Sequence, residues 1–334
     1  MRHLPSRLLS VRQGSFPLAL FLAGCLGVSA GCGKQPKVEN EEGALPSLPT
    51  ALLLEQQVSG TILGKTLKSP SALASDDRGA LYLIDAGNRR AIWFDARLSP
   101  IRDFSGEGSS TGRLSDPVFL SVDADHTVWI TDAGRGVLVQ CSDKLEFMAE
   151  IEPKDEETPQ QVFDLAGIAV VDFGEVWLAD KNNNRIAVLD ALGQVKYYVG
   201  DFGYAGGSLR QPGKLLLSRR NHIYVCDTEN RRIVIYDDRA SFLGEIKHPV
   251  LERPAAVAVD RFDRPWILDT DSGRLHCFDE KGEYLASLGP IVSGTDRSLS
   301  RPSDLAFTLD GRLVISDTGN DRLLICRILT DTQP

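Results

Sequence analysis

Short runs of β-branched, aromatic and aliphatic residues recur along most of the chain, and turn residues separate them. One run, Ile223 to Cys226, ends at Asp227 and is followed by polar residues, which indicates a strand and then a tight turn. The next run, Ile233 to Tyr236, is apolar at consecutive positions, so both faces of that strand should be covered. A proline such as Pro212 precedes most of these groups, and proline suits the first residue of a strand because it has no N–H to donate. The pattern therefore predicts an all-β protein made of repeated groups of strands.

The groups repeat in register on one aspartate. These aspartates stand 42 to 48 residues apart and are Asp85, Asp132, Asp180, Asp227, Asp269 and Asp317. Fifteen residues before each of them stands a proline, except at Leu165, and five residues after it stands an arginine, except at Val137. A period of this length is typical of a four-stranded propeller blade. We therefore expect a six-bladed β-propeller over about residues 50–330.

The two ends of the repeat region complement each other. The last copy ends at Ile328 without a fourth strand, whereas an unassigned strand, Val58 to Gly64, precedes the first copy. An overlap of this kind closes the ring and leaves no inner edge unpaired. We therefore expect the N-terminal strand to complete the last blade.

The repeat resembles the NHL family. Residues 166–190, A-G-I-A-V-V-D-F-G-E-V-W-L-A-D-K-N-N-N-R-I-A-V-L-D, follow that family's aromatic residue, Asp-x-Gly-Asn-x-Arg turn and Ile-x-Val-Phe-Asp strand. All six copies fit, and copy 2 departs most, with Gly136-Val137 at the arginine step and Cys141 at the aromatic position. The resemblance implies a six-bladed propeller with one of two functions. It is either a rigid binding platform or a lyase or lactonase-like hydrolase with a metal in the central channel.

The recurring aspartate and arginine could be mistaken for an active site. A feature that every blade carries is explained more simply by what every blade needs, here a turn cap and an ion pair joining neighbouring blades. The arginines of this structural fingerprint are Arg90, Arg185, Arg232, Arg274 and Arg322. Function should therefore lie where the copies differ.

The copies differ most in the connections from each fourth strand to the next first strand. In a propeller these connections share a face with the Asp-to-Arg turns, and loops on one rigid face are a common place for recognition. The long ones are Gly106 to Leu114, Glu152 to Phe163, Asp201 to Gln211 and Pro290 to Arg301. The second is acidic, and the third supplies the binding-face candidates Asp201, Phe202, Tyr204 and Arg210.

The first strands of the blades line the central channel. Small residues dominate the two inward columns, in which only Lys214 and Asp304 are ionisable. Under the enzymatic alternative these channel candidates would act with calcium or zinc, and Asp164 and Glu252 lie near strand starts. No histidine falls in these columns, so we assign no catalytic residue, metal ligand or resident cofactor.

The cysteines of the repeat region occupy apolar columns in different blades, which predicts buried thiols. They are Cys141, Cys226, Cys277 and Cys326. Cys277 and Cys326 belong to adjacent blades and are the pair that an exported protein could oxidise, so the disulfide status stays open.

The N-terminus is typical of a bacterial lipoprotein. Three arginines and no acidic residue precede or border the apolar stretch at residues 16–24, which is too short to span a bilayer. The sequence L-A-G-C, which ends at Cys25, resembles the lipobox, in which the cysteine is acylated and becomes the new N-terminus; Cys32 is the alternative. We expect a signal peptide over 1–24, a polar tether over 25–49, and attachment to the cell envelope on the periplasmic side or at the surface.

The formal net charge of −9 opposes the phosphate neutralisation on which nucleic-acid binding depends. The expected partners are therefore an envelope protein or glycan, together with the membrane through the lipid anchor.

Changing Cys25 to alanine should move the protein from the membrane fraction to the soluble fraction, because the acylated thiol would be lost. Fractionation followed by immunoblotting checks this expectation. Continued anchoring of the variant would transfer the assignment to Cys32 or to an uncleaved signal.

Overall fold

A computed structural model describes residues 47–108, 111–157, 163–171, 174–200, 207–289 and 298–331 of the chain. Internal contacts divide the chain into two units, Met1–Ala44 and Leu45–Pro334. The first unit, with Cys25 and Cys32, lies outside the described residues. The second unit contains all the secondary structure given below.

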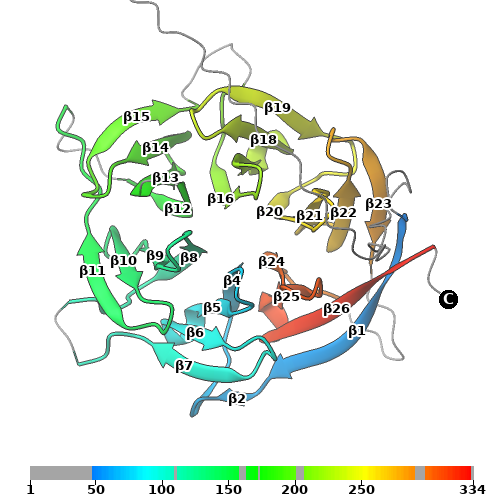
Figure 1. Cartoon of the computed structure of the whole chain (residues 1–334), viewed down its shortest axis with the longest axis horizontal. Helices are drawn as coiled ribbons and strands as arrows, with labels where there is room; N and C mark the ends of the chain where they lie inside the picture. Colours follow the sequence, from blue (N-terminus) through cyan, green and yellow to red (C-terminus); the bar gives the residue numbers. More distant parts are fainter. Residues whose placement is uncertain are drawn as a thin grey trace, which may run out of the picture. The chain divides into compact units, whose positions relative to one another are not determined.

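Six four-stranded antiparallel sheets form the blades of a propeller, as the sequence predicts (Figure 1). Blades 1 and 2 contain β4 (Pro70–Ser75), β5 (Leu81–Asp85), β6 (Arg90–Phe94), β7 (Pro100–Phe104), β8 (Pro117–Val122), β9 (Val128–Asp132), β10 (Val137–Cys141) and β11 (Phe147–Ile151). Blades 3 and 4 contain β12 (Leu165–Val171), β13 (Glu175–Asp180), β14 (Arg185–Leu189), β15 (Val195–Val199), β16 (Pro212–Leu217), β17 (His222–Asp227), β18 (Arg232–Asp237) and β19 (Phe242–Lys247). Blade 5 contains β20 (Pro254–Val259), β21 (Pro265–Asp269), β22 (Arg274–Phe278) and β23 (Tyr284–Leu288).

Blade 6 joins the two ends of the chain. It consists of β24 (Asp304–Phe307), β25 (Leu313–Asp317), β26 (Arg322–Thr330) and the N-terminal strand β1 (Pro49–Ser59), in the order β1-β26-β25-β24. The predicted closure by an N-terminal strand is confirmed. The strand itself lies earlier than expected. Gly60 follows its last residue with a positive φ of 77°, and Leu63 and Gly64, with φ values of 49° and 81°, turn the chain back between β2 (Thr61–Ile62) and β3 (Lys65–Thr66).

The first strand of each blade faces the centre of the ring and the fourth runs along the rim (Figure 1). Proline begins four of the six first strands, which accords with its lack of an N–H group. Backbones approach closely near the centre: a Cβ atom at Gly167 of β12 would lie 2.2 Å from the carbonyl oxygen of Gly213 in β16. A residue larger than glycine would therefore not fit at position 167.

Hydrophobic side chains fill the spaces between blades. One buried cluster joins blades 4 and 5 through Ile233, Val257 and Phe278, and another joins blades 5 and 6 through Leu268 and Leu324. Strands covered on both faces explain the consecutive apolar residues seen in the sequence. The four propeller cysteines are buried free thiols.

None of the helices in the described residues is long and apolar enough to cross a membrane.

His276 is an exception to the apolar filling. It is 2% exposed, and neither ring nitrogen has a hydrogen-bond partner. Alternate residues of a strand share a face, so His276 lies on the same side of β22 as Phe278 and points toward blade 4. The corresponding residues of other blades are Ile92, Val234 and Leu324. Burial lowers the pKa of His276, because the charged imidazolium is desolvated there.

Replacing His276 by leucine should stabilise the protein by about 1 kcal/mol near pH 7, because two unsatisfied polar atoms leave the core. The gain should grow as the pH falls below about 6.5, since unfolded histidine then binds a proton that folded His276 resists. Urea unfolding of both proteins between pH 5 and 8, with His222→Asn as the control for a partly exposed histidine, checks this. A pH-independent difference would contradict it.

Candidate functional site

The fingerprint aspartates hold the inter-blade connections in place. In blade 1, Asp85 Oδ1 accepts a hydrogen bond of 2.9 Å from the Lys68 backbone N–H, just before β4. Asp85 Oδ2 accepts hydrogen bonds of 2.8 Å from Asn88 Nδ2 and Arg90 Nε. Asp85 and the five equivalent aspartates are fully buried. Each of the six carboxylates bonds the end of a connection, and in every blade except blade 2 it also bonds the turn beside it.

The ion pair recurs in four blades. It joins Asp85 to Arg90, Asp180 to Arg185, Asp227 to Arg232 and Asp317 to Arg322. In blade 5, Arg274 instead donates to Ser287 Oγ at 2.7 Å, and blade 2 has Val137 at this position. Both partners of each pair belong to one blade. The expectation that the pair joins neighbouring blades is therefore wrong.

Threonine hydroxyls make part of the link between neighbouring blades. The residue after the aspartate is threonine in blades 4, 5 and 6, and its hydroxyl donates to the carbonyl oxygen of the proline that precedes or begins the next first strand. The three bonds are Thr228 to Pro254 (2.9 Å), Thr270 to Pro302 (3.1 Å) and Thr318 to Pro70 (2.7 Å). The sequence contains this column, but threonine in a turn has many uses, so the column by itself does not predict the link between blades.

The two channel candidates meet at the centre of the ring. Lys214 of β16 and Asp304 of β24 are 6% and 1% exposed, and they form an ion pair between Nζ and Oδ1. Lys214 Nζ also donates to the carbonyl oxygens of Leu305 at 3.2 Å and Leu73 at 3.4 Å. The backbone N–H groups of Leu305 and Leu73 donate to Asp304 at 2.7 and 2.8 Å. This network connects blades 1, 4 and 6 across the axis.

Asp304 is poorly suited to hold a metal ion in this arrangement. Its two carboxylate oxygens already accept three hydrogen bonds. Burial raises its pKa, an effect that Lys214 and the two amides oppose. Within the described ranges, no group of three or more His, Cys, Asp or Glu side chains is placed to bind a metal. The side chains at the axis therefore do not fit the calcium or zinc site of the enzymatic alternative.

The predicted binding-face residues are only partly described. Asp201, Phe202 and Tyr204 lie outside the described residues. Arg210 is exposed, and its backbone N–H donates to Asp227 Oδ1 at 2.6 Å. The fingerprint thus fixes the base of this connection and leaves the Arg210 side chain exposed.

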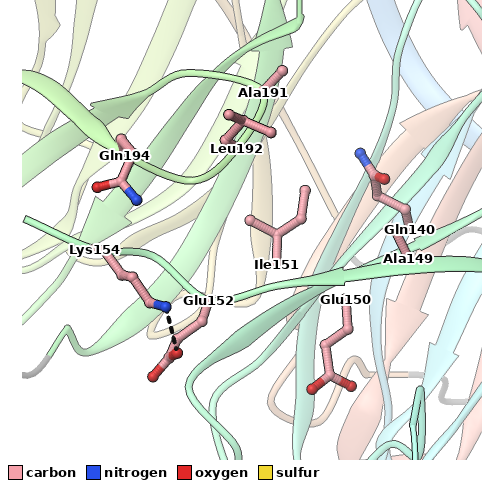
Figure 2. A pocket seen from close by; sticks show the side chains of 9 residues that line it. All are labelled: Gln140, Ala149, Glu150, Ile151, Glu152, Lys154, Ala191, Leu192 and Gln194. Atoms are coloured by element: carbon pink, nitrogen blue, oxygen red, sulfur yellow. Dashed lines mark ion pairs between the residues drawn. The ribbon is translucent and has the colours of Figure 1, made fainter.

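A hollow lies at the rim between blades 2 and 3 (Figure 2). Its volume is about 550 Å³, and its lining comes from β10, β11, the chain after β11 and the turn before β15: Gln140, Ala149, Glu150, Ile151, Glu152, Lys154, Ala191, Leu192 and Gln194. We call it the seam groove. The backbone of Lys154 bonds to Gly193 and Val195 at 2.8 Å each, which holds the two blades together along one side of it.

The seam groove carries polar groups of different kinds. Glu150 forms a bidentate pair with Arg135, with both oxygen–nitrogen distances 2.6 Å, and Glu152 pairs with Lys154 at 3.3 Å. The buried Gln194 Oε1 atom accepts no hydrogen bond, which leaves an acceptor for a ligand or water. Leu192 is 79% exposed. The sequence pointed to the acidic connection that begins at Glu152, but not to Gln140 or Gln194, which only the blade packing brings to it.

Comparison with known proteins identifies the fold but no family. No family model matches the chain, and no curated protein matches it. A solved streptogramin B lyase is 15% identical with a TM-score of 0.59, covering 82% of this chain and 98% of the other. A catalytically inactive variant of virginiamycin B lyase from Staphylococcus aureus, with quinupristin, is 15% identical with a TM-score of 0.58, covering 83% and 88%. At this identity the likeness shows the six-bladed propeller architecture alone.

Replacing Lys214 by methionine should destabilise the protein by about 3–5 kcal/mol, because it leaves the Asp304 carboxylate buried without its counter-charge. A second change, Asp304→Asn, should restore at least half of the loss, since the amide oxygen can still accept a backbone hydrogen bond. Urea unfolding of the two single variants and the double variant checks the coupling. Additive losses would show that the pair does not act as a unit.

Proposed function

We propose that this protein is a lipid-anchored, NHL-like propeller that binds an envelope protein or glycan at the seam groove and the neighbouring connections. The observation that carries the proposal is the contrast between the axis and the rim. At the axis, Lys214 and Asp304 form an ion pair with each other. At the rim, the seam groove retains an unpaired buried acceptor and an exposed leucine.

The chemistry of the groove favours a protein segment with hydrogen-bond donors and positive charge. Gln194 Oε1 can accept from a backbone or side-chain N–H. The adjoining chain carries Glu152, Asp155, Glu156 and Glu157, which would attract a basic segment and steer its approach. Leu192 offers apolar contact area beside these groups. A neutral glycan could use the acceptor but would gain less from the acidic chain.

The connections are suited to recognition because their bases are fixed. A buried aspartate bonds the backbone at the end of each connection in the described blades, as Asp227 bonds Arg210. The intervening residues can therefore vary without disturbing the sheet. Under this proposal Phe202 and Tyr204 also take part in recognition, and the partner lies on the exported side of the membrane.

A lyase-like enzyme is the second candidate, and the structural neighbours named above favour it. It requires a reacting centre that the described side chains do not form at the axis, where Asp304 is bonded to Lys214 and backbone amides. Thermal unfolding with calcium or zinc, before and after chelation, distinguishes the two candidates. A saturable stabilisation that Asp304→Asn abolishes would favour the enzyme over the platform.

A photoreactive amino acid placed at Leu192 should crosslink to a specific partner in intact cells. Gln194→Leu should reduce that crosslink at least tenfold, since the acceptor is lost while the groove keeps its shape, and Phe202→Ala with Tyr204→Ala should weaken it as well. Gel electrophoresis of the crosslinked products provides the measurement.

The same photoreactive residue at Leu309, which is 57% exposed in the turn between β24 and β25, is the matched control and should give no such product. Equal crosslinking from positions 192 and 309, or no effect of Gln194→Leu, would remove the seam groove from the proposal. Unchanged melting temperatures would confirm that the variants remain folded.

A further inference from the structure

The described chain enters the propeller on the face opposite the long connections. In the closing blade, Pro49 pairs with Thr330, whereas Ser59 pairs with Arg322 beside the Asp317 turn. The Ser47 carbonyl oxygen accepts a hydrogen bond of 3.2 Å from Arg264 Nη1. Arg264 lies in the turn between β20 and β21, so the chain enters beside this turn of blade 5.

That turn holds an exposed aromatic side chain on a rigid support. Asp260 Oδ1 accepts backbone hydrogen bonds from Phe262 at 2.9 Å and from Arg264 at 3.0 Å, and Asp260 Oδ2 accepts from Arg264 Nε at 2.8 Å. Phe262 is 48% exposed. The guanidinium carbons of Arg261 and Arg264 lie 4.7 and 5.0 Å from its ring centroid. An aromatic ring flanked by arginines is typical of surfaces that contact the lipid headgroup region.

The neighbouring turn of blade 4 adds positive charge. Arg220 in that turn pairs with Asp263 at 2.7 Å, which ties the two turns together, and with Glu280 at 3.0 Å, so the positive charge that remains unpaired there is that of Arg219. Arg219 beside it and Arg261 are exposed and form no ion pair with a described residue. Leu48, next to Ser47, is 47% exposed. Two unpaired cations therefore lie with two apolar side chains near the point where the chain enters.

We propose that this membrane patch, defined as Leu48, Arg219, Arg261 and Phe262, contacts the anionic headgroups of the bilayer that carries the lipid anchor. The inference rests on the proposed anchoring at Cys25. Cys25 and Ser47 are 22 residues apart, and a chain of that length can reach at most about 75 Å. The anchor would thus keep the patch at a high local concentration near the bilayer.

The patch is too small to hold the protein on a membrane by itself. Two arginines and two partly exposed apolar side chains give weak binding, which becomes effective only with a second attachment. Together, anchor and patch would orient the propeller. Its opposite face, which carries the long connections, would then point away from the lipid, where a partner can approach.

The test uses the full-length, lipidated protein with Cys32→Ser, in vesicles of phosphatidylethanolamine and phosphatidylglycerol. A fluorescent label is attached at Phe262→Cys or, as the control, at Glu229→Cys, which is exposed in the turn between β17 and β18 on the connection side. The propeller cysteines should not react, because they are buried and burial raises their pKa values, to about 12 for Cys141, Cys277 and Cys326. Quenching by a nitroxide lipid with its spin label near the headgroup measures proximity to the membrane.

Quenching at position 262 should be at least twice that at position 229. It should fall to the control level after Arg219→Glu with Arg261→Glu, or in phosphatidylcholine vesicles, while Arg89→Glu, at an exposed arginine of the turn between β5 and β6 on the connection side, leaves it unchanged. Equal quenching at 262 and 229 in protein that floats with the vesicles would overturn the membrane patch and leave the anchor standing. Protein that does not float would overturn both. A label at 262 that responds to envelope proteins but not to vesicles would assign the patch to a protein partner instead.

Discussion

The propeller depends on a carboxylate that is fully buried in every blade. A buried carboxylate is costly unless hydrogen bonds replace its hydration. Asp85 shows how this is met, with a backbone N–H from the connection on one oxygen and Asn88 and Arg90 on the other. The same hydrogen bonds thus replace the lost hydration of the carboxylate and fix the connection in place. Because only the base of the connection is held, its remaining residues can vary in length and chemistry.

The ring is closed by contacts between residues far apart in sequence. The β1–β26 pairing completes blade 6, and Thr318 bonds to Pro70 to join the last blade to the first. At the centre, Lys214 and Asp304 hold three blades together across the axis. The ionisable side chains at the centre are therefore used to hold the blades together, and the candidate binding surfaces lie at the rim and on the two faces.

The two faces of the ring carry different turns and connections. One face carries the Asp-to-Arg turns and the long connections, which are anchored at their bases and variable between them. The other carries the short turns, where Asp260 supports Phe262 beside the entry of the chain at Ser47. This asymmetry follows from strand direction, because consecutive antiparallel strands place alternate turns on opposite faces.

The sequence by itself determined the number of blades, the positions of most strands and the burial of the cysteines, because periodicity and turn chemistry are local properties that repeat six times. It misplaced the closing strand, since a half-exposed outer strand has a weak pattern and the positive φ values after Ser59 are not visible in it. Only the tertiary structure paired Lys214 with Asp304 and brought Gln194 to the seam groove. Those contacts depend on how separate blades pack around the axis, and no local sequence pattern specifies the distance between side chains of different blades.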